Sequence, residues 1–228
     1  MIGFINELQN LIYATFILEN RWRFFLEGLQ MTILLTVTSF VFGSLLGAGF
    51  CAMKMSKRTG VRKIANAVIS FLVQLPTLVI LMLFVYLIFG SVPISAVIIV
   101  IFGLTLKAGS YLADIFYTAI TAVNKGEVEA AYTLGFNKIQ TFFYVIFPQA
   151  LNMGLPVYKN QFIITMQETS IVGYLAIMDL TRASDIITSR TLNALFGLIV
   201  ISILYLLLGW IGGKCLDLLS HKKHLEVF

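Results

Sequence analysis

Charged residues are scarce in this chain of 228 residues, where Asp, Glu, Lys and Arg make up 12%, against about 25% in an average soluble domain. Only four prolines are present and no low-complexity run interrupts the chain, so we expect residues 1–228 to form a single domain. The hydrophobic share of 59% and the mean hydropathy of +0.92 indicate an integral membrane protein. The net charge of +5 therefore bears on how loops are placed, and it does not indicate nucleic-acid binding.

Reactive side chains are few as well. Cys51 and Cys215 are the only cysteines, and both lie at the ends of apolar blocks beside lysines, so we expect them to stay reduced. His221 and His224 have a spacing that could bind a metal, but no carboxylate or thiol cluster completes a site. We therefore expect a solvated basic tail and no metal.

An ATP site is also missing. The string nearest to a phosphate-binding loop is at residues 212–215, with Leu208 in place of the first glycine and Cys215 in place of the Ser or Thr that holds magnesium. No histidine lies near Ser110 or Ser170 in sequence, so no nucleophile constellation is visible. We expect a protein that is not an enzyme and binds no cofactor.

Long apolar blocks are abundant, and five of them are expected to cross the membrane as helices. They lie at about residues 25–53, 64–89, 93–123, 155–171 and 192–219. The loop after the first block carries five basic residues and no acid, the tail is basic, and the turn at 90–93 is uncharged. Since basic loops stay in the cytoplasm, this predicts an all-α, polytopic fold with the N-terminus outside and the C-terminus inside.

Details of packing follow from small and polar residues. Residues 4–20 are apolar but interrupted by polar side chains, which favours an interfacial helix, with a sixth span as the alternative. Two glycine pairs, Gly43 with Gly47 and Gly209 with Gly213, predict close helix contacts, and Gly49 adds a third small residue to the first. Pro76 frees a carbonyl inside the second span, and that carbonyl must find a partner.

Residues 124–148 are the only amphipathic stretch. Asn124 with Glu127 three residues on resembles a capping box, and Gly135 is placed to end the helix that follows. Asn137 with Gln140 starts a second helix, which should stop or kink near Pro148. The charge count places these two short helices in the cytoplasm, where they would form a docking element.

The run Glu129-Ala130-Ala131, with Gly135 and Pro148 downstream, resembles the EAA signature of permease subunits of ABC importers, whose fold is the type I importer fold. Residues 148–150, 160–163 and 167–170 resemble the polar amino-acid branch of that family. The resemblance makes residues 124–148 the coupling segment, with ATPase-coupling residues Glu129, Ala130, Ala131, Gly135 and Pro148. It implies a permease for polar amino acids in the bacterial inner membrane. The implied partners are an ATPase dimer that binds ATP, a second permease chain (identical or homologous) and an extracytoplasmic solute-binding protein.

Some positions depart from the family pattern. Residues 73–76 read Val-Gln-Leu-Pro where the family often has Arg-Gly-Thr-Pro, and Gln167-Glu168 stands where Lys-Asp is usual. Tyr117-Thr118 replaces an Arg-Gly pair, so Asp114 lacks its usual basic neighbour. We expect Asp114 to brace the coupling segment, with capping of a helix as the alternative.

Lys107 and Glu168 are the charges expected inside spans. Left unpaired, each would cost about 2.5–3.5 kcal/mol at a helix centre. One hypothesis is a structural ion pair between them. The other is a pocket for a zwitterion, with Lys107 near its carboxylate and Glu168 near its amino group. Hydrogen bonds in that pocket would come from Tyr111, Gln161, Thr165, Thr169 and Ser170.

Two further function classes stay open at this point. An ion-driven secondary transporter or channel for small polar solutes would need no cytoplasmic docking surface, and the lack of an internal repeat weakens this alternative. A membrane scaffold without transport would not explain the polar fourth span.

Overall fold

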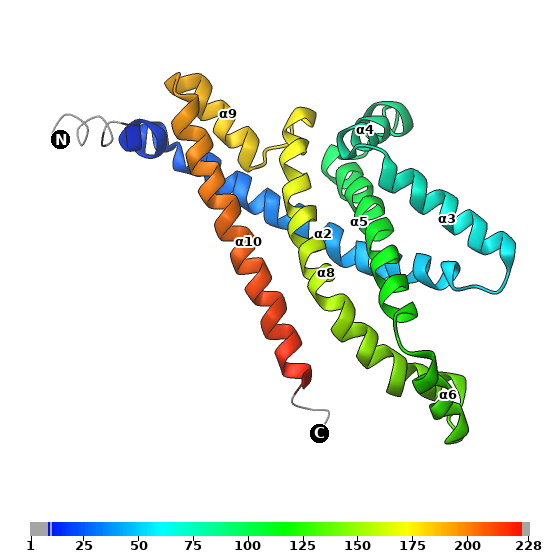
Figure 1. The fold of residues 1–228 in the computed structure, drawn as a ribbon. Coiled ribbons are helices and arrows are strands. Elements are labelled where there is room, and N and C mark those ends of the chain that lie inside the picture. Colours follow the sequence, from blue (N-terminus) through cyan, green and yellow to red (C-terminus); the bar gives the residue numbers. More distant parts are fainter. Residues whose placement is uncertain (1–8, 10, 225–228) are drawn as a thin grey trace.

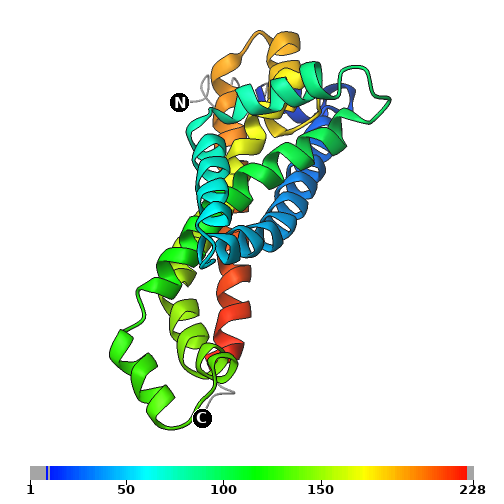
Figure 2. The ribbon, with the colours of Figure 1, turned by 90° about the vertical axis from the view of Figure 1, so that its right-hand side faces the viewer.

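The computed structural model describes residue 9 and residues 11–224, with side chains as far as residue 218. All regular structure in this part of the chain is helical, which confirms the all-α expectation. The helices α2 (Trp22–Lys54), α5 (Ala96–Thr121) and α10 (Ala194–His224) are long and apolar enough to cross a membrane. Helices α8 and α10 extend toward the end of the molecule that carries α6, while α9 lies at the opposite end (Figures 1 and 2).

The expected second span, residues 64–89, is not one continuous helix. It is split into α3 (Thr59–Gln74), α4 (Thr77–Met82) and the π-helix η3 (Leu83–Ile88), with a bend of 105° at the break. Pro76 has no N–H to donate and keeps the preceding residue extended, so the helix ends before it. By length and composition the described chain has three membrane-crossing helices, or four if the bent pair counts as one.

The expected fourth span is longer than residues 155–171. It begins at α7 (Lys138–Thr141), passes through the π-helix η4 (Phe142–Ile146) into α8 (Phe147–Glu168) and ends in η5 (Thr169–Leu175). The prediction that a helix stops near Pro148 is wrong. The helix changes register at the π-helix η4 and continues into α8. The proline lies in the first turn of α8, where a missing N–H is tolerated.

Glycines let α2 and α5 approach closely, as the first glycine pair predicts. A Cβ on Gly43 would lie 3.0 Å from Ala108 Cβ, and one on Gly47 would lie 2.8 Å from Leu112 Cβ. Gly49 takes no part, since a Cβ there would meet nothing within 4 Å. Gly43 and Gly47 therefore create a close contact between α2 and α5.

The second glycine pair is placed differently from the prediction. A Cβ on Gly213 would meet nothing within 4 Å, and one on Gly209 would only touch Met166 Cε at 3.5 Å. The close contact lies at Gly212 instead, where a Cβ would lie 2.4 Å from the Phe162 ring. Gly212 is thus the residue that lets α10 approach α8.

The helix α9 (Leu180–Thr191) closes the end of the bundle opposite α6. Buried Asp179 caps it by accepting hydrogen bonds from the backbone N–H groups of Thr181 (3.1 Å) and Arg182 (2.9 Å). Burial raises the pKa of the Asp179 carboxyl, while these hydrogen bonds act in the opposite direction. The Asp179 carbonyl packs on α2, 2.6 Å from where a Cβ on Gly28 would be.

The expected interfacial helix, residues 4–20, lies partly outside the described residues, because 4–8 and 10 are not described. Its described part contains the π-helix η1 (Tyr13–Ile17) and the 3-10 helix η2 (Leu18–Asn20). The chain turns at Glu19, which has a positive φ of 56°, and Glu19 accepts a hydrogen bond from Arg190 of α9 at 3.2 Å. This segment is therefore fixed to the α9 end of the bundle.

Candidate functional site

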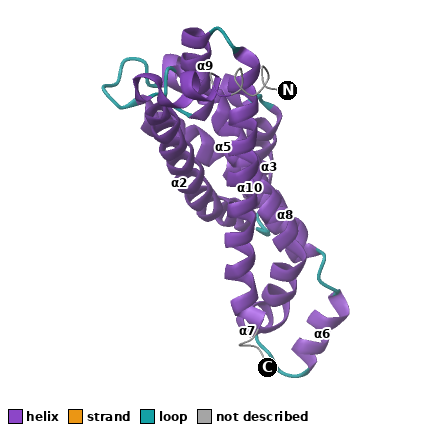
Figure 3. Ribbon diagram, turned by 90° about the vertical axis from the view of Figure 1, so that its left-hand side faces the viewer, coloured by secondary structure: helices purple, strands orange, loops and turns teal. Residues whose placement is uncertain are grey.

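The helix α6 (Lys125–Thr133) projects from the bundle, as Figure 3 shows, and the chain turns at Gly135 after its last residue. The Asn124 side chain accepts a hydrogen bond from the N–H of Gly126 at 2.9 Å. At the other end Gly135 has φ +87°, and the N–H of Phe136 reaches the carbonyl of Ala131 at 3.1 Å. With the Gly135 N–H on the Tyr132 carbonyl at 3.0 Å, this is a Schellman motif, which confirms the predicted glycine ending.

The second short helix starts with the predicted capping box. The Asn137 side chain accepts from the N–H groups of Ile139 (3.0 Å) and Gln140 (2.9 Å), and the Gln140 side chain accepts from the Asn137 N–H at 2.9 Å. The predicted capping box at Asn124 is not completed by Glu127, because the Glu127 side chain accepts a hydrogen bond from the Gln149 side chain of α8 instead. This bond ties α6 to the helix that returns into the bundle.

The predicted coupling residues differ in exposure. Ala131 is buried at 4% exposure, whereas Glu129, Ala130 and Gly135 are exposed and Pro148 is half-buried. Glu129 makes no side-chain hydrogen bond or ion pair within the described chain, whereas Glu127 ties the segment to Gln149. The small side chain of Ala131 serves packing inside the hairpin.

Sequence reasoning missed a cluster of apolar side chains at this end of the molecule. The cluster, called the tip patch here, is highly exposed, as Leu134 (77%), Tyr144 (72%) and Ile139 (70%) illustrate. Its members are Tyr132, Leu134, Phe136, Ile139, Phe143 and Tyr144. Large exposed apolar patches mark interaction surfaces. The signal that could have found it is the set of apolar residues interleaved with polar ones in residues 132–144.

Lys107 lies against the break between α3 and α4. Its Nζ donates to three carbonyl oxygens, those of Leu72 (2.8 Å), Val73 (2.9 Å) and Leu75 (2.5 Å). The Leu72 carbonyl would bond the N–H four residues on, but that residue is Pro76, which has none. An ammonium has three donors, so the buried Lys107 is fully used. The hypothetical ion pair with Glu168 is not formed.

Glu168 holds the other side of the same break. Its Oε1 accepts a hydrogen bond from the hydroxyl of Thr77, the first residue of α4, at 2.7 Å. Its Oε2 is buried without a hydrogen-bond partner. Because buried polar atoms are nearly always paired, this oxygen is a free acceptor that a ligand could use.

The remaining residues of the predicted pathway fall into two groups. Tyr111 lies beside Lys107, with its ring centroid 5.3 Å from the Lys107 Nζ and its hydroxyl 3.5 Å from the Val73 carbonyl. Thr165 and Thr169 are buried, and their hydroxyl groups donate to carbonyl oxygens of α8 at 2.9 and 2.7 Å.

Gln161 and Ser170 complete the predicted set. Gln161 is buried with an unpartnered Nε2, so it is a second free polar atom on α8. Ser170 lies apart, lining a separate cavity of about 310 Å³ together with Arg182 and Asp185 of α9. The structure therefore brings Lys107 and Tyr111 together at the break, with Glu168 holding its other side, and leaves Ser170 at the α9 end.

Asp114 does not brace the coupling segment. Its carboxylate pairs with Lys54 Nζ at 2.5 Å, and that ammonium also lies 4.7 Å from the Tyr117 ring centroid. Lys54 supplies from α2 the positive charge that Asp114 lacks on its own helix. Within the residues whose side chains are described, no group of three or more His, Cys, Asp or Glu could hold a metal, and His221 and His224 lie outside that part.

Residues 39–222 match the family described as binding-protein-dependent transport system inner membrane component. The chain belongs to this family. A curated relative, the L-cystine transport system permease protein TcyB of Bacillus subtilis (strain 168), is 30% identical over 224 residues, covering 96% of this chain and 94% of that protein. The probable amino-acid ABC transporter permease protein YckA of the same organism is 29% identical over 206 residues, covering 88% of this chain and 90% of the relative.

Solved structures agree with this membership. An amino acid ABC transporter with histidines has a chain that superposes with a TM-score of 0.81 at 32% identity, covering 90% of this permease and 96% of that chain. The MetNI methionine ABC transporter, in an inward-facing form, shares the fold with a TM-score of 0.63 at 19% identity, covering 84% and 92%. The chain is thus a transmembrane permease subunit of an ABC importer and not an enzyme. Membership in this family implies an ATPase partner and a permease partner. It rules against the alternative of an ion-driven secondary transporter or channel.

Proposed function

We propose that the permease crosses the bacterial inner membrane five times, with its N-terminus outside and its C-terminus inside. The crossings are α2, the α3–α4 pair, α5, α8 and α10, within one domain of residues 1–228 whose bundle covers about residues 25–219. The basic loop after α2 and the position of α6 at the end of the bundle away from α9 support this orientation. The segment 124–148 then lies in the cytoplasm as the coupling segment.

The proposed assembly contains a second permease chain, identical or homologous, two ATPase subunits and an extracytoplasmic solute-binding protein. ATP binds the ATPase partner, and this chain carries no cofactor. We assign the docking of the ATPase to the tip patch and the exposed face of Glu129 and Ala130. Gly135 sets the corner that presents this face, while Ala131 and Pro148 hold the hairpin together.

Leu134→Asp is expected to weaken the permease–ATPase complex by at least about tenfold, because loss of a hot-spot residue at the centre of an interface costs about 2 kcal/mol or more. The complex is measured by co-purification and by transport-coupled ATPase activity. Leu192→Asp is the matched control, since Leu192 is 91% exposed in α9's C-terminal turn near the opposite end. An equal loss in both variants, or none in Leu134→Asp, contradicts the assignment.

The substrate that this site fits best is a polar amino acid. The observation that carries the proposal is the buried Glu168 Oε2 without a partner, since an α-ammonium group would donate a charge-assisted hydrogen bond to it. The proposed pathway consists of Lys107, Tyr111, Gln161, Thr165, Glu168, Thr169 and Ser170. In this pathway Lys107 positions the α3–α4 break, and Thr77 and Glu168 connect that break to the substrate.

The test is ATP-dependent amino-acid uptake into vesicles that hold the permease with its co-expressed partners. Glu168→Gln should raise the KM at least about tenfold, because a hydrogen bond to a charged group contributes about 1.5–3 kcal/mol. Gln167→Ala, at an exposed position on the same helix, is the control and should leave the KM unchanged. Uptake driven by an ion gradient without ATP would refute the proposed function, and an unchanged KM in Glu168→Gln would refute the proposed site.

A further inference from the structure

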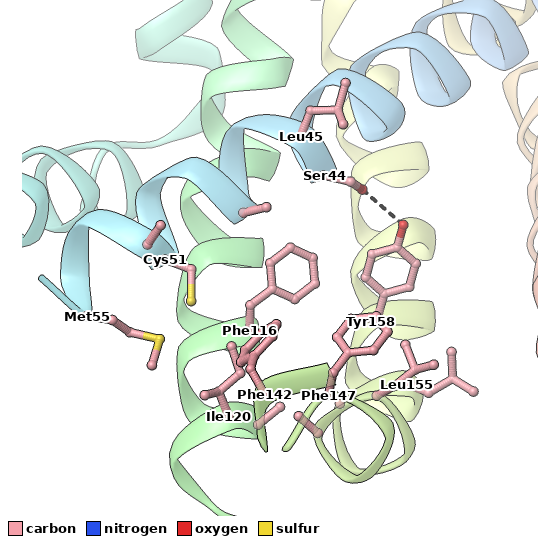
Figure 4. Close-up of a pocket in the computed structure, with 16 residues that line it drawn as sticks. Ser44, Leu45, Cys51, Met55, Phe116, Ile120, Phe142, Phe147, Leu155 and Tyr158 are labelled. Carbon is pink, nitrogen blue, oxygen red and sulfur yellow. Dashed lines mark hydrogen bonds between the residues drawn. The ribbon is translucent and has the colours of Figure 1, made fainter. Parts of the chain in front are cut away.

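An apolar cavity of about 720 Å³ lies between the C-terminal halves of α2 and α5 and the beginning of α8 (Figure 4). In the close-up, Cys51 of α2 and Met55 just after it line one side, and Phe116, Phe142 and Phe147 line the other side. Its volume lies in the range of about 300–1,000 Å³ that ligand sites occupy. The cavity is therefore large enough for an elongated guest.

The lining has almost no polar group to offer. Its two hydroxyl groups belong to Ser44 and Tyr158, and they satisfy each other with a hydrogen bond of 3.0 Å. A water molecule in a cavity needs two to four polar partners, so an apolar guest is favoured here over water or a polar solute. The cavity opens to the surface of the protein beside Leu45, which is 67% exposed, and Met55, which is 45% exposed.

The cavity is separate from the substrate pathway proposed above. Phe116, which lines the cavity, lies nine residues after Lys107 on α5, and nine residues are about two and a half helical turns. The two side chains therefore point to opposite faces of α5. A translocated amino acid on the Lys107 face does not enter this cavity.

Unpaired positive charge follows directly after the cavity lining. Met55, the residue directly after α2, lines the cavity, and Lys57 and Arg58 come two and three residues later in the loop to α3. Both side chains are exposed, and neither takes part in a hydrogen bond or ion pair within the described chain. Lys54, in contrast, is used by Asp114. Basic residues beside a pocket between membrane helices favour anionic lipid headgroups.

We propose that this cavity binds an anionic phospholipid, with an acyl chain among the apolar side chains of α2, α5 and α8 and the phosphate on Lys57 and Arg58. The placement of the lipid in the cytoplasmic leaflet rests on the membrane orientation proposed above. The acyl chain of a phospholipid fits the apolar cavity, and its phosphate fits the basic residues at the opening of the cavity. A bound lipid of this kind would fill the space between α2 and α8 and stabilise the end of the bundle that carries α6.

The first experiment measures the lipid that stays with the assembled importer. The complex is reconstituted in vesicles of equal phosphatidylglycerol and phosphatidylethanolamine, extracted in mild detergent, and the retained phospholipid is quantified by mass spectrometry. The wild-type complex should retain phosphatidylglycerol above its share of the vesicle. Ala52→Trp fills the cavity from α2 and should remove most of this retained lipid, and the smaller Ala52→Leu should reduce it if the Trp variant does not fold.

The matched control is Ala67→Trp, because Ala67 is also an exposed helical alanine but does not line the cavity. Equal retention in Ala52→Trp and Ala67→Trp, or retained lipid with the composition of the vesicle, overturns the proposal. Separation of the two permease chains by Ala52→Trp, seen as a smaller complex in size-exclusion chromatography, also overturns it. That result would mean that a second permease chain covers the cavity.

A second comparison tests the basic mouth. The pair Lys57→Gln with Arg58→Gln should lower the preference for phosphatidylglycerol by at least about tenfold, since each basic residue contributes about a fivefold preference for anionic lipid. The pair Arg62→Gln with Lys63→Gln removes the same charge one turn further on and should have less effect. Equal effects of the two pairs would indicate a general surface attraction and would contradict a local site. The readout is lipid and not uptake, so it does not depend on the proposed substrate.

Discussion

Lys107→Met is expected to lower the free energy of unfolding by about 3 kcal/mol or more and to abolish uptake. The carbonyl of buried Leu72 and those of the part-buried Val73 and Leu75 would lose the Lys107 donor, and an unsatisfied buried acceptor costs about 1–3 kcal/mol. The Leu72 carbonyl has no alternative within its own helix, because Pro76 supplies no N–H. The measurement is thermal unfolding of the variant in lipid nanodiscs, followed by uptake in vesicles.

Lys159→Met is the control for this prediction. Lys159 pairs with Asp217 across α8 and α10, and the aspartate is about half exposed. Exposed ion pairs contribute only about 0–1 kcal/mol, so this variant should remain nearly as stable as the wild type. A Lys107→Met protein that is as stable to unfolding as the wild type but binds substrate weakly would contradict the structural role. It would support the hypothesis that Lys107 binds the substrate carboxylate.

Gly47→Leu should destabilise the bundle by about 1–3 kcal/mol or more, whereas Gly49→Leu should be neutral or slightly stabilising. At Gly47 a Cβ would lie 2.9 Å from the backbone oxygen of Gly109 and 2.8 Å from Leu112 Cβ, so α2 and α5 must separate. At Gly49 nothing lies within 4 Å, and replacing a helical glycine removes a cost of roughly 0.5–1 kcal/mol. The two substitutions are the same change, two residues apart in one helix.

Thermal unfolding of the two variants side by side measures the difference. If Gly49→Leu is as destabilising as Gly47→Leu, the cost comes from the added leucine itself and not from the α2–α5 contact. A bundle separated at Gly47 should also lose transport, because α5 carries Lys107 on its far side. Uptake in the two variants checks this second consequence.

The two proposed sites use different faces of α5. The Lys107 face contacts the end of α3 and the Phe116 face lines the lipid cavity, so one helix separates the substrate pathway from a lipid site. The Lys54–Asp114 pair connects α2 to α5 near that cavity. A change in lipid occupancy would therefore first alter the packing of α2 against α5 and α8, at the α6 end of the bundle.

Local features of the chain were predictable because they depend on residues close in sequence. The capping box of Asn137 and Gln140, the Schellman ending at Gly135 and the small residues Gly43 and Gly47 follow from short-range hydrogen bonding and side-chain size. Apolar length identified the three long helices in the same way. The EAA motif was sufficient to indicate the family, because its spacing belongs to one hairpin.

Contacts between distant residues were not predictable from local patterns. Lys107 and Glu168 each lie inside an expected span, and the sequence suggests that they pair with each other or with a substrate. In the tertiary structure Lys107 instead donates to carbonyls at the helix end before Pro76, and Glu168 accepts a hydrogen bond from Thr77. Both side chains lie against the α3–α4 break. The same holds for Gly212 in place of Gly209 and Gly213, because helix rotation selects which glycine faces a neighbour.

The sequence by itself determined that this is an all-α membrane permease with a capped helical hairpin within residues 124–148, because apolar length, capping residues and motif spacing are properties of contiguous residues. Only the tertiary structure decided which buried charge has a free atom. Glu168 Oε2 lacks a partner and Lys107 Nζ has three, and this depends on residues more than thirty positions away that the bend at Pro76 brings into contact.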